Sequence, residues 1–272
     1  MAISVIIITH NEENNIAECL SCLGFADEVV VLDHASTDRT VEIAKSLGAV
    51  VYTTPDWPGF GPQKNRALAL ARCPWVLSLD ADERVTQALQ EEILTAVASG
   101  TYGMSGTSKV AYRLSRRSSY CGQWIDHSGW RPDWVLRLFC RGYARFSDDL
   151  VHEKLQSDGA IGQLHSPLLH LSFPDFESVL TKANHYSTAS AHMMASRGQS
   201  TNLWCALGHG AWAFIRTYVL RRGFLEGQMG LALALSNAEG SYYRYAKLWL
   251  MTRQPAYRSN RTNQTNRTDQ AH

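Results

Sequence analysis

The sequence lacks the marks of a membrane-spanning or exported protein. No apolar run reaches the roughly 18 residues of a membrane span. The richest stretch, residues 211–220, is interrupted by Arg216. The N-terminus starts with a strand-like run and has neither a basic leader nor a cleavage site, so we expect no signal peptide. These absences predict a protein that is made and retained in the cytoplasm.

Cysteine is sparse, with six residues scattered over 272 positions, which excludes a secreted disulfide scaffold. Cys19 and Cys22 form a C-x-x-C pair, but no second pair follows to complete a four-cysteine zinc site. The pair also falls late in an expected helix, away from the N-terminal dipole that activates thiols. We therefore expect small buried thiols here.

Net charge is also low, at +1, and by itself indicates no nucleic-acid partner. A hydrophobic content of 45% excludes disorder over most of the chain. The low total hides an asymmetry: residues 1–196 carry a net charge of −6, and residues 197–258 carry +6. The acidic N-terminal part and the basic C-terminal part indicate two regions with different partners.

The first 100 residues alternate between buried-strand runs and amphipathic helical patterns. Strands are expected at 3–9, 28–33, 49–53 and 75–80, and helices at 12–23, after Ser36 or Thr37, at 63–71 and at 86–99. Such alternation predicts an α/β fold with a parallel sheet and right-handed crossovers.

The rest of the chain changes character twice. Between residues 110 and 170 the pattern is irregular, and from residue 175 it is helical. Helices are expected at 176–197, 202–222 and 227–249. Beyond Arg253 the polar composition predicts disorder. The expected division is a catalytic domain at 1–174, a helical region at 175–253 and a disordered tail at 254–272.

Acidic and small polar residues follow three of the expected strands, where ligands bind in open α/β sheets. The strand ends are Thr9–Glu12, Asp33–Asp38 and Asp80–Glu83. No G-x-G-x-x-G and no P-loop follows the first strand, which excludes both phosphate-binding fingerprints. The carboxylates of Asp80 and Asp82 suit Mg²⁺ or Mn²⁺ bridging to substrate phosphates, although a solvated acidic turn is the plain alternative.

Other candidates each have a structural alternative. Asp33 could accept hydrogen bonds from a nucleotide base or ribose, or it could stabilise a turn or a helix start. His170 suits a metal or a phosphate, or a half-buried packing position. Lys64 and Asn65, at a helix start, suit phosphate or donor sugar. Arg137 suits a diphosphate or an acceptor phosphate, or an ordinary surface position.

The basic end of the chain interleaves aromatic rings with arginines. Trp204, Trp212 and Tyr218 alternate with Arg216 and Arg221. This mixture suits an anionic membrane surface, with the rings at headgroup level. The alternative is packing of these helices on the acidic face of the catalytic domain.

Several segments resemble a known family. Residues 4–12, 29–38 and 79–83 are similar to the family 2 glycosyltransferases of GT-A fold. Residues 137–141, 149–153, 168–173, 218–225 and 245–249 resemble the lipopolysaccharide-core β-1,4-glucosyltransferase subgroup. The resemblance covers roughly residues 1–250. It implies a GT-A (Rossmann-like), mostly parallel sheet flanked by helices, with a C-terminal helical extension.

The resemblance implies an inverting, metal-dependent transfer of a hexose, glucose from UDP-glucose, to a heptose of the lipopolysaccharide inner core. The general base for the acceptor hydroxyl is expected at Glu153, with Asp149 second. The expected ligands of Mg²⁺ or Mn²⁺ are Asp82, Asp80 and His170. The residues expected at the nucleotide sugar are Thr9, Asn11, Glu12, Asp33, Lys64, Asp80 and Arg137.

The expected partners are therefore a nucleotide sugar, a lipopolysaccharide core glycolipid and the inner face of the cytoplasmic membrane, with no nucleic acid. Three alternatives stay open at this point. The first is a glycosyltransferase with another donor or with a polyprenyl-phosphate acceptor. The second is a non-catalytic protein that binds sugar nucleotides or lipopolysaccharide. The third, a nucleotidyltransferase, would want a glycine-rich basic loop after the first strand, where residues 11–15 have the wrong charge.

Overall fold

The computed structural model describes residues 1–99, 109–147 and 154–253. Contacts divide the chain into two compact units. The first comprises Met1–Ser118 and Pro132–Ser172, and the second comprises Ser119–Arg131 and the chain from Phe173 onward. The second unit thus includes a segment, 119–131, that the sequence division at residue 174 left in the first domain. The expected tail at 254–272 lies outside the described residues.

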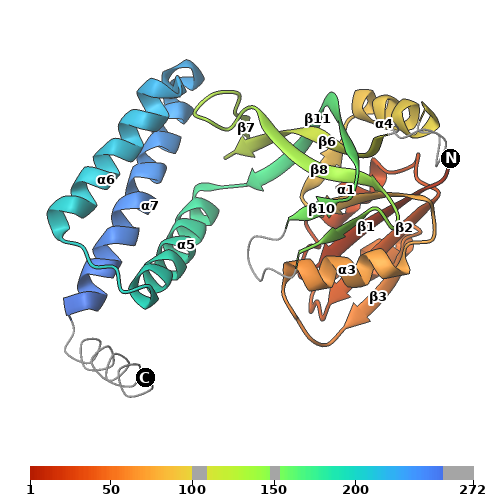
Figure 1. Cartoon of the computed structure of the whole chain (residues 1–272), viewed down its shortest axis with the longest axis horizontal. Coiled ribbons are helices and arrows are strands. Elements are labelled where there is room, and N and C mark those ends of the chain that lie inside the picture. Colours follow the sequence, from red (N-terminus) through yellow and green to blue (C-terminus); the bar gives the residue numbers. More distant parts are fainter. Residues whose placement is uncertain (100–108, 148–153, 254–272) are drawn as a thin grey trace. The chain divides into compact units, whose positions relative to one another are not determined.

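The first unit is built on a mixed β-sheet (Figure 1). Four strands are parallel, in the order β3-β2-β1-β4. They are β1 (Ile3–Thr9), β2 (Glu28–His34), β3 (Val50–Thr54) and β4 (Trp75–Asp80). The α/β fold expected from the alternating pattern is confirmed.

The sheet continues beyond β4 with strands in the order β8-β6-β11-β5. These strands are β8 (Asp133–Cys140), β6 (Lys109–Tyr120), β11 (Ala160–Phe173) and β5 (Glu83–Val85). The pairs β4–β8, β8–β6 and β11–β5 are antiparallel. Parallel pairing thus joins β3, β2, β1 and β4, and these further pairs are antiparallel, so the sheet is mixed. Strands β9 (Ala144–Phe146) and β10 (Leu155–Ser157) form a separate pair.

Helices α1 (Ile16–Ser21), α2 (Thr40–Ser46), α3 (Phe60–Leu70) and α4 (Gln87–Ser99) belong to the first unit. Helix α1 is shorter than the expected 12–23. The backbone N–H groups of Glu12 and Glu13 donate to Thr40 Oγ1 and Asp38 Oδ2, at 2.7 and 3.1 Å. These bonds tie the start of the expected helix to the loop after β2, so the helix begins later.

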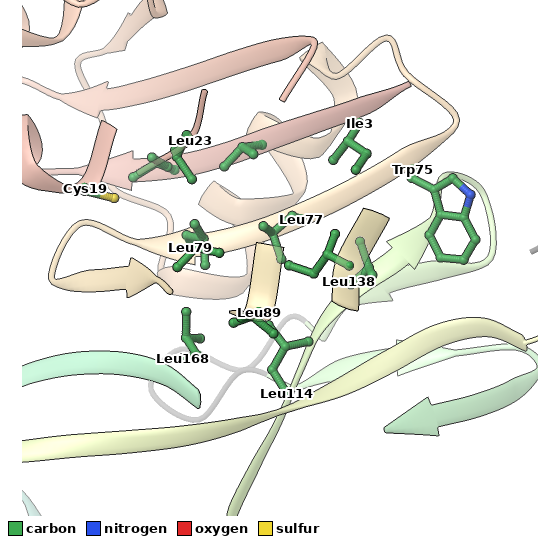
Figure 2. Close-up of a cluster of buried hydrophobic side chains, with 14 of the residues drawn as sticks. Ile3, Cys19, Leu23, Trp75, Leu77, Leu79, Leu89, Leu114, Leu138 and Leu168 are labelled. Atoms are coloured by element: carbon green, nitrogen blue, oxygen red, sulfur yellow. The ribbon is translucent and has the colours of Figure 1, made fainter. Parts of the chain in front are cut away.

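Buried side chains pack on both faces of the sheet, as expected for strands covered on each side. On one face Leu77 and Leu79 of β4 pack with Leu89 of α4 (Figure 2). On the other face Ile6 packs with Ala67 of α3. Fully burying one such leucine or isoleucine contributes about 1.5–3 kcal/mol. The two layers hold the strand ends in fixed register.

The cysteine pair at the end of α1 belongs to this core. Cys19 is completely buried, Cys22 is half-buried, and both are free thiols. Burial raises the pKa of Cys19, so the reactive thiolate form is disfavoured. The expectation of small structural thiols is confirmed.

The second unit is mainly helical, with the helices lying side by side (Figure 1). Its elements are β7 (Gln123–Trp124), α5 (Phe176–Ser196), α6 (Leu203–Ile215), the π turn η1 (Arg216–Leu220), the 3₁₀ turn η2 (Gly223–Glu226) and α7 (Gly227–Arg253). Asp175 and Asn202 cap α5 and α6 through side-chain oxygens that accept backbone N–H bonds. The expected helix at 202–222 is thus real but ends in a π turn.

The long helix α7 is tied to both of its neighbours in the second unit. Lys247 Nζ lies within 3.0 Å of four oxygens of α5, on Asn184, Ser187 and Thr188, to which its three N–H groups donate. The Glu226 carboxylate, just before α7, accepts the backbone N–H groups of Asp126 and His127. Within the described ranges, no helix combines the length and apolarity needed to cross a bilayer.

Candidate active site

The ends of β1, β2 and β4 meet at one edge of the sheet. In the strand register Thr9 lies opposite Asp33, and Ile8 lies opposite Asp80. The polar residues that follow the three strands are therefore neighbours, as the sequence predicts. This is the edge at which open α/β sheets bind ligands.

Asp33 organises the loops at this edge. It is completely buried, and its carboxylate accepts hydrogen bonds from Thr9 Oγ1 and from the backbone N–H of Ser36, both at 2.9 Å. Asn11 adopts a left-handed backbone (φ 55°) and joins the two loops through Ser36 Oγ and the Thr37 N–H. In this arrangement Asp33 shapes the loop, and its direct contact with a nucleotide stays a prediction.

A cavity of about 460 Å³ opens beside these loops. It is lined by Thr9 and Glu12, from the predicted set, and by the rings of His34, Trp57 and Phe60. The His34 and Trp57 rings lie 5.3 Å apart, and those of Trp57 and Phe60 lie 5.0 Å apart at right angles. Flat aromatic walls beside polar strand ends suit a planar heterocycle.

Asp80, at the end of β4, is held by two cations. Its Oδ1 lies 3.0 Å from Lys64 Nζ, and its Oδ2 accepts a short hydrogen bond from Arg137. Arg137 also donates to the buried Glu83 at 2.7 Å, and Arg116 lies 3.6 Å from the same carboxylate. Both carboxylate oxygens of Asp80 are thus engaged by cations, and its role as a metal ligand stays a prediction.

Burial and ion pairing act in opposite directions on these carboxyls. Burial opposes ionisation of Asp80, but Arg137 and Lys64 outweigh it and hold the pKa of Asp80 well below its usual range. For Glu83, which is completely buried, burial dominates and raises the pKa. The cluster therefore fixes an ionised Asp80 at the sheet edge.

Asp82 and His170 face each other across the pairing of β5 with β11. His170 lies opposite Glu83 in this pairing, and the Leu171 N–H donates to the Asp82 carbonyl at 2.9 Å. His170 Nε2 lies 3.3 Å from Asp82 Oδ2, and Nδ1 lies 2.9 Å from Ser118 Oγ. Ser118 thus orients the imidazole with Nε2 toward Asp82, as outer-shell partners of metal-binding histidines do.

This pair fits a divalent cation that is completed by a substrate. No three His, Cys, Asp or Glu side chains converge as a ligand set within the part of the chain that the structure describes. Mg²⁺ is commonly held by only one or two protein carboxylates together with substrate phosphates and water. Asp82 and His170 therefore suit a metal that binds with a diphosphate.

A second cavity of the first unit, about 490 Å³, extends from Asp80. Basic side chains dominate its polar lining, namely Lys64, Arg113, Arg116, Arg137 and Lys154. Trp134, whose ring suits either stacking on a sugar or packing a loop, forms part of its wall. Arg113 and Lys154 are exposed and form no ion pair with the described residues. A cavity with this lining suits a sugar that carries negative charge.

The two residues expected to act as the general base, Glu153 and Asp149, lie outside the described residues, which stop at 147 and resume at 154. Helix α3 begins at Phe60, so Lys64 and Asn65 lie in its middle and not at a helix start as expected. The Asn65 amide pairs with the backbone of Phe146. It therefore joins α3 to β9 in this structure.

Sequence reasoning gave no role to several residues of this edge. Ser118 and Arg116 come from β6, whose place in the sheet no local pattern indicates. Glu83 was counted only as one more acid of a strand end. Trp57 had a usable signal, because an aromatic residue in a proline- and glycine-rich loop is a common binding element.

These observations describe an α/β domain whose polar strand ends and adjoining cavities suit an anionic nucleotide, without a glycine-rich loop. The model of the family described as "Glycosyl transferase family 2" matches residues 4–151, more than half of the chain. The chain therefore belongs to glycosyl transferase family 2. It is a nucleotide-sugar glycosyltransferase of GT-A fold, as the resemblance implied.

Two curated relatives match almost the whole chain. An uncharacterized glycosyltransferase of Rickettsia typhi is 32% identical over 256 residues, 90% of this chain and 86% of that protein. The lipopolysaccharide core biosynthesis glycosyltransferase LpsC of Rhizobium meliloti is 28% identical over 259 residues, 90% of this chain and 94% of that one.

Solved structures are more distant. Glucosyl-3-phosphoglycerate synthase from Mycobacterium tuberculosis, crystallised with Mn²⁺, UDP and glucosyl-3-phosphoglycerate, is 27% identical over 43% of this chain and 44% of that one (TM-score 0.35). TarS from S. aureus is 18% identical over 96% of this chain and 87% of that one (TM-score 0.48). Likeness at this level does not define a shared substrate.

The charge cluster around Arg137 generates a stability prediction. Arg137→Met leaves Asp80 and Glu83 with less compensation, and we expect a loss of about 3–5 kcal/mol at pH 7. The pKa of Asp80 is depressed in the folded state, so its stabilisation is present above pH ~4 and is lost as pH falls below that value. The difference from wild type should therefore shrink in acid.

The measurement is urea unfolding without metal at pH 7 and pH 3, followed by hydrogen exchange of the β4 amides. Arg113→Met is the matched control, because Arg113 is exposed and forms no ion pair with the described residues. Equal losses for the two variants at pH 7 would contradict the assigned cluster.

Proposed function

We propose that this glycosyltransferase transfers glucose from UDP-glucose, with inversion, to a heptose of the lipopolysaccharide inner core, with Mg²⁺ or Mn²⁺. Two findings support the acceptor: the motif resemblance to the core glucosyltransferase subgroup, and the relative LpsC, which is named for core biosynthesis. The observation that carries metal-dependent donor binding is Asp82 facing His170 at 3.3 Å, on the edge where three strands end.

The nucleotide base would enter the cavity beside β1 and β2. Trp57 and His34 offer ring faces there, and Thr9 and Glu12 offer polar groups. Base–aromatic stacking contributes about 1–3 kcal/mol per base. Asp33 stabilises this site, because its carboxylate accepts the Ser36 N–H and so holds the loop that follows His34.

The diphosphate would lie toward Asp82. Asp82 and His170 would hold the metal, which neutralises charge on the departing diphosphate. Lys64 and Arg137 keep Asp80 ionised and fixed next to this position. The basic cavity that begins at Asp80 would then receive the sugar and the acceptor.

Attack on the anomeric carbon requires a base at the acceptor hydroxyl. We propose that Glu153 is the general base that accepts the proton of the acceptor hydroxyl, with Asp149 as the second candidate. Both precede Lys154 in the sequence, and Lys154 lines the basic cavity.

The second unit supports a role in membrane association. Several large apolar side chains are exposed along α6 and the turns that follow it, with Trp204 82%, Leu220 60% and Trp212 54% exposed. The surrounding segment, 197–258, carries a net charge of +6. Exposed indole rings on a basic surface suit the headgroup region of an anionic bilayer. Binding to the membrane through this surface would bring the enzyme to a lipid-linked acceptor.

The metal assignment is tested with Asp82→Asn. We expect turnover and Mn²⁺-dependent UDP binding to fall together by more than about 100-fold, because even outer-shell partners of metal ligands contribute about 10–100-fold. Ser118→Ala, which frees the His170 ring, should give a smaller loss. Calorimetric titration of UDP with and without Mn²⁺ measures the effect. Asp158→Asn is the control, and full turnover by Asp82→Asn would overturn the assignment.

The base assignment is tested with Glu153→Gln. Donor binding should stay within about twofold of wild type, while transfer falls by roughly 10²–10⁴-fold, the usual contribution of a general base. Asp149→Asn is the comparison. The measurement is single-turnover transfer to a truncated core acceptor. If Asp149→Asn abolishes transfer and Glu153→Gln does not, the general base is Asp149 and the assignment to Glu153 is wrong.

The membrane surface is tested by sedimentation with vesicles. The full chain should bind phosphatidylglycerol vesicles at low salt and bind phosphatidylcholine vesicles weakly. The triple variant Trp204→Ser, Trp212→Ser, Leu220→Ser should bind phosphatidylglycerol vesicles at least about tenfold more weakly. Each of these side chains contributes roughly 1.5–3 kcal/mol on burial. Trp57→Ser is the control, and equal binding by both variants would exclude this surface.

A further inference from the structure

The second unit encloses a cavity of its own, about 460 Å³ in volume. Four basic side chains line it: Lys182, Arg216, Arg221 and Arg244. No carboxylate is among the described residues of the lining. The three arginines form no ion pair with any part of the chain that the structure describes. All three arginines are solvent-exposed, and such a cluster of unpaired guanidinium groups suits an anion taken from solution.

A π turn brings two of these arginines to the cavity. In an α-helix, residues five apart are rotated by about 140° and point in different directions. Here the Arg221 N–H donates to the Arg216 carbonyl at 2.9 Å, the five-residue spacing of a π turn, so both residues come to one face. Turns of this kind often occur at functional sites.

The loop opposite this turn is shaped around Arg221. Gly129 has a positive φ of 82°, and a Cβ there would lie 2.4 Å from Arg221 Cδ and Nη1. Next to it, the Ser128 N–H donates to the Arg221 carbonyl at 2.9 Å. The absence of a side chain at Gly129 therefore makes room for the arginine stem in the cavity wall.

One buried polar group at the cavity lacks a partner. Ser128 lines it and is only 1% exposed, yet its hydroxyl has no hydrogen-bond partner among the described residues. An unsatisfied buried hydroxyl costs about 1–3 kcal/mol. A ligand oxygen in the cavity would satisfy it.

Aromatic rings supply the rest of the wall. The Trp130 and Phe173 rings lie 6.1 Å apart, and Lys182 Nζ lies 4.7 Å from the Phe173 ring centre. Tyr120 and Tyr186 also line the cavity. Aromatic faces beside hydroxyls suit a sugar ring, whereas the guanidinium groups suit a phosphate.

We propose that this cavity is a second binding site and that its ligand is a phosphorylated saccharide. The site lies in the unit that does not contain Asp82, and it does not depend on the donor site proposed above. Arg216, Arg221 and Arg244 bind the phosphate, Ser128 donates to it, and the rings hold the sugar. The phosphorylated sugar is either free in solution or carried by a lipid.

The test uses the full chain with UDP and Mn²⁺ present at saturation, so that the first unit is filled. Glucose 6-phosphate is titrated by calorimetry, with glucose as the unphosphorylated control. A lipid-borne source is tested with phosphatidylcholine vesicles that contain monophosphoryl lipid A, against vesicles of equal charge made with phosphatidylglycerol. Far-ultraviolet circular dichroism checks that each variant folds.

Arg221→Gln and Arg244→Gln should each weaken binding about 10- to 100-fold, the size of one charge-assisted hydrogen bond. Arg197→Gln is the matched control, an exposed arginine of the same unit that does not line the cavity. Asp82→Asn should retain this binding, which separates this proposal from the metal site.

Binding of glucose 6-phosphate with this pattern of variants supports the proposal and identifies a soluble ligand. The same pattern only with lipid A vesicles supports it and identifies a lipid-borne ligand. The proposal is overturned if neither probe binds more tightly than its control. It is also overturned if Arg221→Gln and Arg197→Gln bind equally.

Discussion

The position of Arg137 between Asp80 and Glu83 is the interaction on which the sheet edge depends. Arg137 comes from β8, whereas Asp80 ends β4 and Glu83 begins β5. Its guanidinium joins the parallel part of the sheet to the antiparallel part at the edge where the parallel strands end. Because these carboxylates are buried, removal of their cation leaves charge without compensation.

The same stretch also positions the proposed metal ligands. Glu83 starts β5, and the pairing of β5 with β11 brings His170 beside Asp82. A buried charge cluster and a strand pairing thus determine two neighbouring sites. The aromatic cavity beside β1 and β2, where we propose that the nucleotide base binds, lies at the same edge of the sheet.

The sequence allowed the parallel half of the fold and its strand ends to be predicted, because local periodicity and strand-end acids carry that information. It did not indicate the antiparallel half, because the places of β6, β8 and β11 depend on pairings between distant segments. For the same reason Ser118 was not a candidate. His170 was expected as a metal ligand with Asp82 and Asp80, but no local pattern indicated its place opposite β5. The π turn at Arg216 was read as plain helix, since helical periodicity does not register one inserted residue.

The central claim is that a divalent metal binds with the nucleotide between Asp82 and His170. Paramagnetic broadening of backbone amide signals by Mn²⁺ measures this directly. With UDP present, the account predicts the strongest broadening at Asp82, Glu83 and His170, and little broadening in the second unit. Broadening that is centred elsewhere, or unchanged when UDP is omitted, would contradict it.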